Sequence, residues 1–228
     1  LIETIAEDLL AAFRQAPLLD AYDVYQHLMD YWAETMQDDA YLIAAEGWVS
    51  VAANYRLSPR VAFPEHLLDC KLALRWIREH IAEHGGDPDF VVVTGGSAGG
   101  HLAALLALTP NDPEFQPGFE DVDTSVTACV PFYGVYDLVE EFDPRDRAGP
   151  RGERVGQWFA RRIAGATVEE DRERFVQSSP ISHVGPHAPP FFVVHGKSDN
   201  LVPVEQARRF VAALREVADA QAVRGDER

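Results

Sequence analysis

The chain has 228 residues and a formal net charge of −17 at pH 7, because 37 acidic side chains outnumber 20 basic ones. A charge this negative is repelled by phosphate backbones and anionic lipids, so nucleic acids and acidic membrane surfaces are excluded as expected partners. The length fits one α/β domain with a large core, and no apolar run reaches the roughly 18 residues of a transmembrane helix.

Residues 1–39 show apolar side chains at helical spacing in two stretches, so we expect an N-terminal helical segment. The second stretch carries an aromatic and methionine face, which we expect to pack in a core or a lid: Tyr22, Tyr25, Met29, Trp32 and Met36. The chain starts at Leu1, inside this helical pattern and without a Met, which indicates a fragment.

From residue 40 onward, apolar stretches alternate with amphipathic ones, and we expect one α/β domain over residues 40–218. Helices are predicted to begin near Glu65, Ser97 and Pro203, and buried strands at 48–55, 90–94, 125–133 and 190–196. This alternation predicts a parallel sheet covered by helices. Residues 138–180 are densely charged with helical pieces, and 219–228 read as a polar tail.

The two cysteines, Cys70 and Cys129, fit neither a disulfide framework nor a C-x-x-C motif, so we expect buried free thiols. No charged-then-apolar segment opens the chain in the manner of a secretory signal, and a cytoplasmic location is therefore favoured. No metal-ligand cluster or nucleotide fingerprint is present, so we expect neither a metal nor a cofactor. The oligomeric state stays open.

The most informative segment is FVVVTGGSAGGH, residues 90–101, which predicts a strand, a tight turn with one serine, and a helix. A G-x-S-x-G pattern in that context exposes the serine hydroxyl at the carboxyl edge of a sheet. We expect Gly95 and Gly99 to allow a turn in which a Cβ would clash. Ser97 is therefore the predicted nucleophile, and a bystander serine in an ordinary glycine-rich turn is the alternative.

Asp199 follows the predicted strand at 190–196, and it too lies past a carboxyl strand end, where functional residues of parallel sheets collect. The chain order, serine and then acid, is that of a nucleophile-elbow triad. In such a triad the imidazole takes the serine proton, and the carboxylate holds the imidazole in the right tautomer.

Five segments in this order carry a resemblance to a known family: NYRLSP (54–59), FPEHLLD (63–69), GGDPDFVVVTGGSAGG (85–100), PFYGVYD (131–137) and HGKSDNLVPVEQA (195–207). Over about residues 47–217 the chain resembles the α/β-hydrolase fold, in particular bacterial hormone-sensitive-lipase-like esterases. The resemblance implies Ser97 as nucleophile, Asp199 as triad acid and the Ala98 N–H as an oxyanion donor. It also implies a lid-like insertion at 138–180 and a small-molecule ester as substrate.

The sequence departs from that family at three points. No histidine follows Asp199, where the family carries its triad base. Upstream of residue 85 the only glycine is Gly47, so the H-G-G-G run and its central strand are missing, and no last strand is recognisable after residue 218. We therefore expect an incomplete sheet and a truncated chain with weak or no turnover.

The triad histidine stays unassigned. We expect helix-end or surface roles for His66, His80 and His84, and packing or turn roles for His101 and His195. His183 and His187 are expected in a loop that can approach the site. No role can be assigned to His27.

Two other classes of function stay open. A non-catalytic, hydrolase-like binding or scaffold protein would explain the missing base, and a peptidase or amidase would use the same elbow on an amide. Reaction of Ser97 with a serine-directed phosphonate separates the esterase from the scaffold, and the leaving group separates the esterase from the peptidase.

Overall fold

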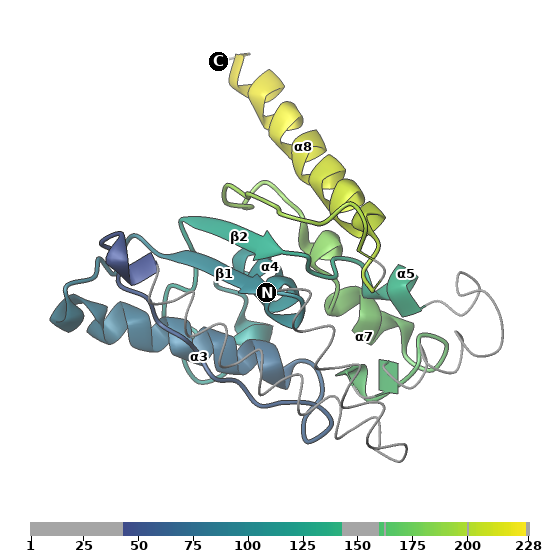
Figure 1. The fold of residues 1–228 in the computed structure, drawn as a ribbon, viewed down its shortest axis with the longest axis horizontal. Helices are drawn as coiled ribbons and strands as arrows, with labels where there is room; N and C mark the ends of the chain where they lie inside the picture. The colour runs from purple at the N-terminus through teal and green to yellow at the C-terminus, as the bar shows by residue number, and fades with distance from the viewer. Residues whose placement is uncertain (1–42, 143–159, 162, 200, 227–228) are drawn as a thin grey trace. The chain divides into compact units, whose positions relative to one another are not determined.

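A computed structural model describes residues 43–142, 160–161, 163–199 and 201–226 (Figure 1). The chain forms two compact units, Leu1–Ala52 and Ala53–Arg228, and the elements named below lie in the second. In the described part of the chain, no helix is both long and apolar enough to cross a membrane.

The sheet consists of parallel strands around the glycine-rich turn. Strand β1 (Val92–Gly96) pairs in parallel with β2 (Ala128–Phe132), and Gly96 stands opposite Phe132 at the carboxyl end. Residues 190–194 run parallel along the other edge of β2 through the bridges Cys129–Phe191 and Phe132–Val194. Figure 1 shows β1 and β2 side by side, over α4. Three of the four predicted strand segments are therefore confirmed as parallel neighbours.

The fourth prediction, a buried strand at 48–55, is wrong for the described structure. These residues form no strand, and all of them except Tyr55 are exposed. Their β-branched and aromatic composition favours an extended backbone, but a strand also needs a neighbour that takes its hydrogen bonds. No described residue pairs with 48–55 as a strand, and the sheet is incomplete, as the sequence predicts.

Two helices build the main core against one face of the sheet. Helix α4 (Ala98–Leu108) contacts both strands and α3 (Glu65–His80). From Leu102 to Leu108 every α4 side chain is buried, as an almost wholly apolar helix requires. The core joins side chains of α3, α4 and the strands: Leu67, Leu74, Leu105, Leu106, Cys129, Val93 and Phe191.

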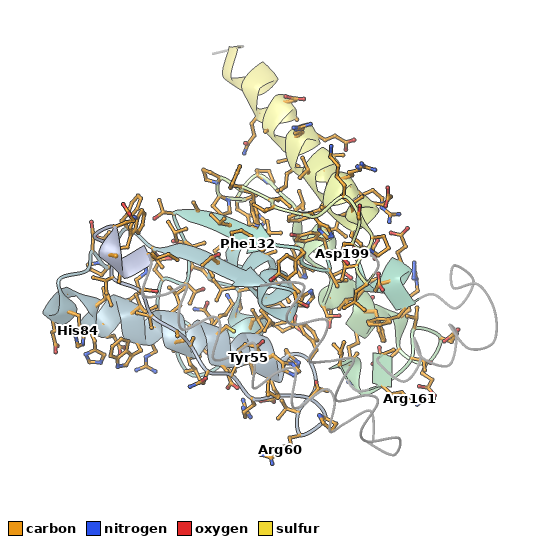
Figure 2. All side chains as sticks on the ribbon, in the orientation of Figure 1. Tyr55, Arg60, His84, Phe132, Arg161 and Asp199 are labelled. Atoms are coloured by element: carbon orange, nitrogen blue, oxygen red, sulfur yellow. The ribbon has the colours of Figure 1, made fainter. Side chains whose placement is uncertain are left out.

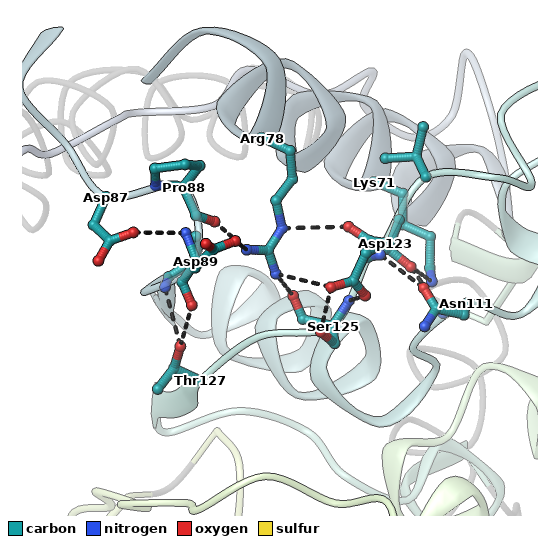
Figure 3. A network of polar contacts seen from close by, with 12 residues as sticks. Lys71, Arg78, Asp87, Pro88, Asp89, Asn111, Asp123, Ser125 and Thr127 are labelled. Carbon is teal, nitrogen blue, oxygen red and sulfur yellow. Dashed lines mark hydrogen bonds and ion pairs between the residues drawn. The ribbon is translucent and has the colours of Figure 1, made fainter. Parts of the chain in front are cut away.

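Helix α3 is joined at its carboxyl end to the loops that lead into the sheet. It passes into a 3₁₀ turn, η1 (Ile81–His84), and ends at Gly85 with φ 81, as the Gly85-Gly86 pair predicts. The Arg78 guanidinium donates to the carbonyls of Pro88, of Asp123 at 3.3 Å and of Ser125 at 2.7 Å (Figure 3). These carbonyls precede β1 and β2, so Arg78 fixes the amino ends of both strands.

A second polar contact lies deeper under α3. Lys71 is fully buried, and its ammonium donates to the Thr109 carbonyl just past α4 and to Thr124 Oγ1 at 3.1 Å. Thr124 Oγ1 in turn donates to Gln116 Oε1 at 2.6 Å. Gln116 closes the loop between α4 and β2, which contains the 3₁₀ turn η2 (Pro113–Phe115), by donating to three of its carbonyls.

The charged segment 138–180 has a small core of its own. Helices α5 (Leu138–Phe142) and α7 (Arg172–Gln177) meet there with Ala160, Ala164 and Val168. The Asp171 carboxylate caps α7 by accepting from the Arg174 N–H at 3.2 Å. Beyond α7 lies the 3₁₀ turn η3 (Pro180–His183). The lid assignment itself stays a prediction.

The last described element is helix α8 (Val204–Asp226). Ala207 and Phe210 pack it against α4, and the Phe210 ring stacks on the Tyr136 ring with 4.3 Å between the ring centroids. The sequence suggested a helix to about residue 217 and then a polar tail. Helix α8 instead continues to Asp226, because residues 218–224 contain good helix formers and no proline.

Candidate active site

Ser97 occupies the turn between β1 and α4. Its backbone has φ 54 and ψ −118, a region that non-glycine residues rarely adopt. The Ser97 N–H donates to the Phe132 carbonyl at 3.0 Å, and the Ser97 carbonyl accepts from the His101 N–H at 3.0 Å. The strained turn is therefore held from one side by β2 and from the other by the first turn of α4.

The glycines around Ser97 serve close packing at some positions and not at others. A Cβ on Gly95 would lie 2.6 Å from the backbone of Gly99, and a Cβ on Gly100 would lie 2.7 Å from the Phe132 carbonyl oxygen. A Cβ on Gly99 would meet nothing within 4 Å. The expectation that both motif glycines avoid a clash is thus correct for Gly95 and wrong for Gly99, and Gly100 is the second glycine that the packing requires.

The Ser97 hydroxyl accepts and donates no hydrogen bond among the described residues, and it does not cap α4. Ala98 is the first residue of α4, and its N–H belongs to the first turn, where no helical carbonyl is available as a partner. An N–H in that position next to a nucleophile can stabilise an oxyanion, and the positive end of the helix dipole adds to the effect.

Asp199 lies in the turn that follows the 190–194 segment, close to the beginning of α8 (Figure 2). Its Oδ1 accepts from the N–H groups of Leu201 at 2.8 Å and Val202 at 2.9 Å. The buried His195 donates from Nε2 to the Val202 carbonyl at 2.9 Å, and this nitrogen lies 3.6 Å from Asp199 Oδ2. One carboxylate oxygen is thus fixed by the turn, and the side chain keeps partial exposure of 22%.

The loop after β2 connects the serine turn with the Asp199 turn. His101, one helical turn beyond Ser97, donates from Nδ1 to the Val135 carbonyl at 2.8 Å. Burial of its ring lowers the pKa of His101 to about 4, so the ring is neutral near pH 7. On the other side, the buried Gln206 of α8 accepts from the N–H groups of Tyr136 and Asp137 at 3.1 and 2.8 Å. The first turn of α4 and the first turn of α8 are therefore both hydrogen-bonded to this loop.

Tyr133 directly follows β2 and contacts both the segment before Asp199 and the turn before Ser97. It has φ 39, and its N–H donates to the Val194 carbonyl at 2.7 Å. A Cβ on Gly96 would lie 2.6 Å from the Tyr133 hydroxyl oxygen, so the phenol covers the residue before Ser97. Sequence patterns do not reveal a positive φ at a tyrosine, and for that reason neither Tyr133 nor Gln206 was singled out from the sequence.

No described histidine hydrogen-bonds Ser97 Oγ. One ring nitrogen of each of five histidines is hydrogen-bonded elsewhere: His66 with Ser58 Oγ, His101 with the Val135 carbonyl, His183 with the Gln177 carbonyl, His187 with the Leu108 carbonyl and His195 with the Val202 carbonyl. The other nitrogen of His195, Nδ1, is buried without a hydrogen-bond partner among the described residues. His80 and His84 lie against the Trp76 ring on α3. His27 lies outside the described residues.

The structure brings Ser97 and the Ala98 N–H together, and it places Asp199 beyond the strand segment on the far side of β2. No hydrogen bond joins Ser97 to Asp199. Among the described residues, no group of three or more His, Cys, Asp or Glu side chains is arranged to hold a metal ion. The strand, the strained serine turn and the helix follow one another as the G-x-S-x-G pattern predicts, on an incomplete parallel sheet with an acid downstream.

The chain belongs to the BD-FAE family, whose profile matches residues 27–214. It is 51% identical over 176 residues to "Probable carboxylic ester hydrolase LipM" of Mycobacterium tuberculosis, covering 77% of this chain and 39% of that protein. It is 49% identical over 174 residues to "Esterase LipQ" of the same organism, covering 76% of this chain and 40% of that protein. The chain thus spans about two fifths of the length of these relatives.

A solved structure supports the same fold. The thermophilic esterase Est2 of Thermogutta terrifontis is 31% identical with a TM-score of 0.53, over 70% of this chain and 51% of that one. The parallel sheet flanked by helices and the family membership predicted from the five sequence segments are therefore confirmed. The roles of individual site residues stay proposals.

Proposed function

We propose that the chain carries the nucleophile and the acid of a carboxylic ester hydrolase that works through an acyl-enzyme. The observation that supports this most directly is the strained backbone of Ser97 at φ 54, between a parallel strand and a buried helix. Such strain persists only where surrounding contacts impose it, and it is typical of functional positions. The names of the relatives, carboxylic ester hydrolase and esterase, give the reaction class.

In the proposed reaction, Ser97 Oγ attacks the ester carbonyl carbon while a base takes the hydroxyl proton. The Ala98 N–H stabilises the oxyanion, the alcohol leaves with a proton, and water then releases the carboxylic acid from Ser97. Asp199 would orient the imidazole that serves as base and stabilise its charged form. Its Oδ1 is fixed by two backbone N–H groups, which prepares the carboxylate for that role.

Slow turnover is part of the proposal. The chain has no histidine after Asp199, and no described histidine is hydrogen-bonded to Ser97. Loss of a triad member leaves a residual acceleration of roughly 10³- to 10⁴-fold over water where oxyanion stabilisation survives. We therefore expect ester hydrolysis by this chain to lie far below ordinary esterase rates.

The test compares hydrolysis of p-nitrophenyl butyrate by the chain with that by Ser97→Ala. Ser198→Ala is the matched control, because Ser198 is an exposed serine in the turn that carries Asp199. The proposal expects a small rate that Ser97→Ala abolishes and Ser198→Ala leaves unchanged. Adding imidazole should raise the rate of the chain above that of Ser97→Ala, since free imidazole then supplies the missing base.

A rate indistinguishable from that of Ser97→Ala, with and without imidazole, would contradict the nucleophile assignment. It would support the non-catalytic binding protein, whose serine needs no base. Cleavage of a p-nitroanilide at a rate comparable to that of the ester would instead support the peptidase or amidase.

A further inference from the structure

Two residues at the carboxyl edge of the sheet have a strained backbone, and Ser97 is only one of them. Ser97 follows β1 with φ 54, and Tyr133 follows β2 with φ 39. The third non-glycine residue with a positive φ in the described part of the chain is Asn111, and asparagine tolerates that region better than tyrosine does. Such strain persists only where surrounding contacts impose it, and it gathers at functional sites.

The peptide group between Phe132 and Tyr133 joins the segments that carry Ser97 and Asp199. Its carbonyl, that of Phe132, accepts from the Ser97 N–H at 3.0 Å. Its N–H, that of Tyr133, donates to the Val194 carbonyl at 2.7 Å, in the strand segment before the Asp199 turn. Because a peptide group is planar and rigid, these two hydrogen bonds fix the backbone of Tyr133 relative to the serine turn.

The phenol of Tyr133 makes a second contact with the serine turn. A Cβ on Gly96 would lie 2.6 Å from the Tyr133 hydroxyl oxygen and 3.0 Å from Cζ. A Cβ stands about 1.5 Å from its Cα, so the hydroxyl oxygen lies within about 4 Å of the Gly96 Cα. Gly96 has no positive φ, so its backbone would accept another residue. The phenol is therefore what excludes a side chain at this position.

This contact restricts a residue that could otherwise release the strain at Ser97. Gly95 and Gly96 precede the serine, and a glycine has no Cβ to confine its backbone. Gly95 is confined on the helix side, where an added Cβ would lie 2.6 Å from the backbone of Gly99. Gly96 is confined by the outer end of the phenol. Without the ring, rotation at Gly96 would let Ser97 leave φ 54 and change the direction of its hydroxyl.

We propose that Tyr133 is a positioning residue for Ser97, which acts by holding the Gly96 backbone with its phenol ring. This inference rests on the proposed function, because it assigns Tyr133 a part in the reaction of the Ser97 hydroxyl. The role requires no contact between Tyr133 and the substrate. Loss of the ring should therefore slow bond formation by Ser97 and leave the binding of a ligand beside it unchanged.

The test is covalent labelling of Ser97 in the full chain by p-nitrophenyl ethyl butylphosphonate, with imidazole added as the base. Ser97 Oγ forms a bond to phosphorus, p-nitrophenolate leaves, and imidazole takes the hydroxyl proton. Peptide mass spectrometry quantifies the adduct. The maximal rate constant of labelling measures bond formation, and the half-saturating concentration measures binding.

Tyr133→Ala should lower the maximal rate constant by about tenfold or more, with the half-saturating concentration unchanged. Tyr133→Phe keeps the ring and should retain most of the rate. The matched control is Tyr55→Ala, which removes another half-buried tyrosine, one whose ring lies edge-on to His66 with 6.4 Å between centroids. This control should change neither quantity. Circular dichroism confirms that each variant is fully folded under the labelling conditions.

A second substitution tests the contact with Gly96 itself. Gly96→Ala should lower the maximal rate constant in the parent chain, because the methyl group and the phenol oxygen cannot both be accommodated at 2.6 Å. In the Tyr133→Ala chain Gly96→Ala should raise it, because alanine then confines the backbone in place of the ring. If Tyr133→Ala does not fold, Tyr133→Phe replaces it, and Gly96→Ala should cost less there, since the nearest ring atom lies 3.0 Å from the methyl group.

Two results would overturn this inference alone: equal maximal rate constants in the parent and Tyr133→Ala chains, or an equal effect of Gly96→Ala in both. A higher half-saturating concentration at an unchanged maximal rate constant would overturn it in favour of a substrate-binding role for the ring. Labelling of the parent chain no faster than that of Ser97→Ala would overturn the proposed function, and this inference with it.

Discussion

The two glycines of the G-x-S-x-G pattern around Ser97 have different structural roles. Gly95 faces the backbone of Gly99 so closely that a methyl group cannot be accommodated, whereas the space beside Gly99 is open. The pattern alone treats the two positions as equivalent. Only the packing of the turn against the helix distinguishes them.

We predict that Gly95→Ala lowers the free energy of unfolding by about 2 to 3 kcal/mol, because backbone atoms cannot move aside without opening the turn. Gly99→Ala should be neutral or stabilise by up to about 1 kcal/mol, since alanine is the better helix former. Urea unfolding of the two variants beside the parent chain measures both effects. Equal losses in the two variants would contradict the packing described here.

The buried Lys71 predicts how stability changes with pH. Burial of the ammonium lowers its pKa to about 8, against about 10.4 in an unfolded chain. Between these values the unfolded state holds more protons than the folded state, so this group makes stability rise with pH over that window. Below about pH 8 both states are protonated, and the desolvation cost is present in full.

We predict that the free energy of unfolding of the parent chain rises from pH 8 to pH 10 relative to that of Lys71→Met, by on the order of 2 kcal/mol. Contributions of other titrating groups are the same in both proteins and cancel in the difference. Cys70, whose thiol pKa is raised to about 12 by burial, is one such group. Urea unfolding of both proteins across this range measures the difference. A difference that is independent of pH would mean that Lys71 titrates normally.

Among the elements, α3 makes polar contacts with the segments that precede both strands through Arg78, in addition to its apolar packing in the core. The Arg78 guanidinium is 14% exposed and donates to carbonyls that precede both strands. Arg75, one turn earlier, forms an exposed ion pair with Glu79 at 2.8 Å. The two arginines therefore form a matched pair on the same helix.

We predict that Arg78→Met lowers the free energy of unfolding by about 1 to 3 kcal/mol, because three carbonyls, two of them half-buried, lose their charged donor. Arg75→Met should cost less than about 1 kcal/mol, as exposed pairs usually do. Thermal or urea unfolding distinguishes the two. A similar small loss for both would show that water replaces the Arg78 contacts without cost.

The elements also show what a sequence pattern can predict. α3 and α4 and the parallel strands around Ser97 follow from apolar periodicity and from glycine positions, which are local signals. The run 48–55 has the same apolar character as the real strands and forms none, because strand formation depends on a partner that lies far away in the sequence. The extent of α8 shows that a polar composition by itself does not end a helix.

For the molecule as a whole, the net charge of −17 adds self-repulsion that a compact state feels more than an unfolded one. We predict that raising NaCl from about 0.02 to about 0.2 M increases the free energy of unfolding at neutral pH, since the screening length falls by about threefold. Urea unfolding at the two salt concentrations measures the change. A decrease would indicate that exposed ion pairs such as Arg56–Asp69 contribute more than the repulsion.

At the same scale, the sequence could predict where the candidate site residues lie relative to the strands, but not how the surrounding segments assemble. The types and chain order of Ser97 and Asp199 are visible in the sequence, because strands and turns around them have clear signals. The role of the loop after β2 was not visible, since it depends on Tyr133 at a positive φ and on the distant Gln206. Contacts of that kind arise only once the sheet has brought the segments together.

At Ser97 the strained backbone lowers the stability of the fold at the residue that is proposed as the nucleophile. At φ 54 a glycine would relieve conformational strain on the order of 1 kcal/mol or more, so the folded chain would be more stable without the side chain that is proposed to react. Ser97→Ala keeps that strain and Ser97→Gly releases it, although both remove the hydroxyl. The strain at Ser97 therefore lowers the stability of the folded chain, and strained positions of this kind are typical of functional sites.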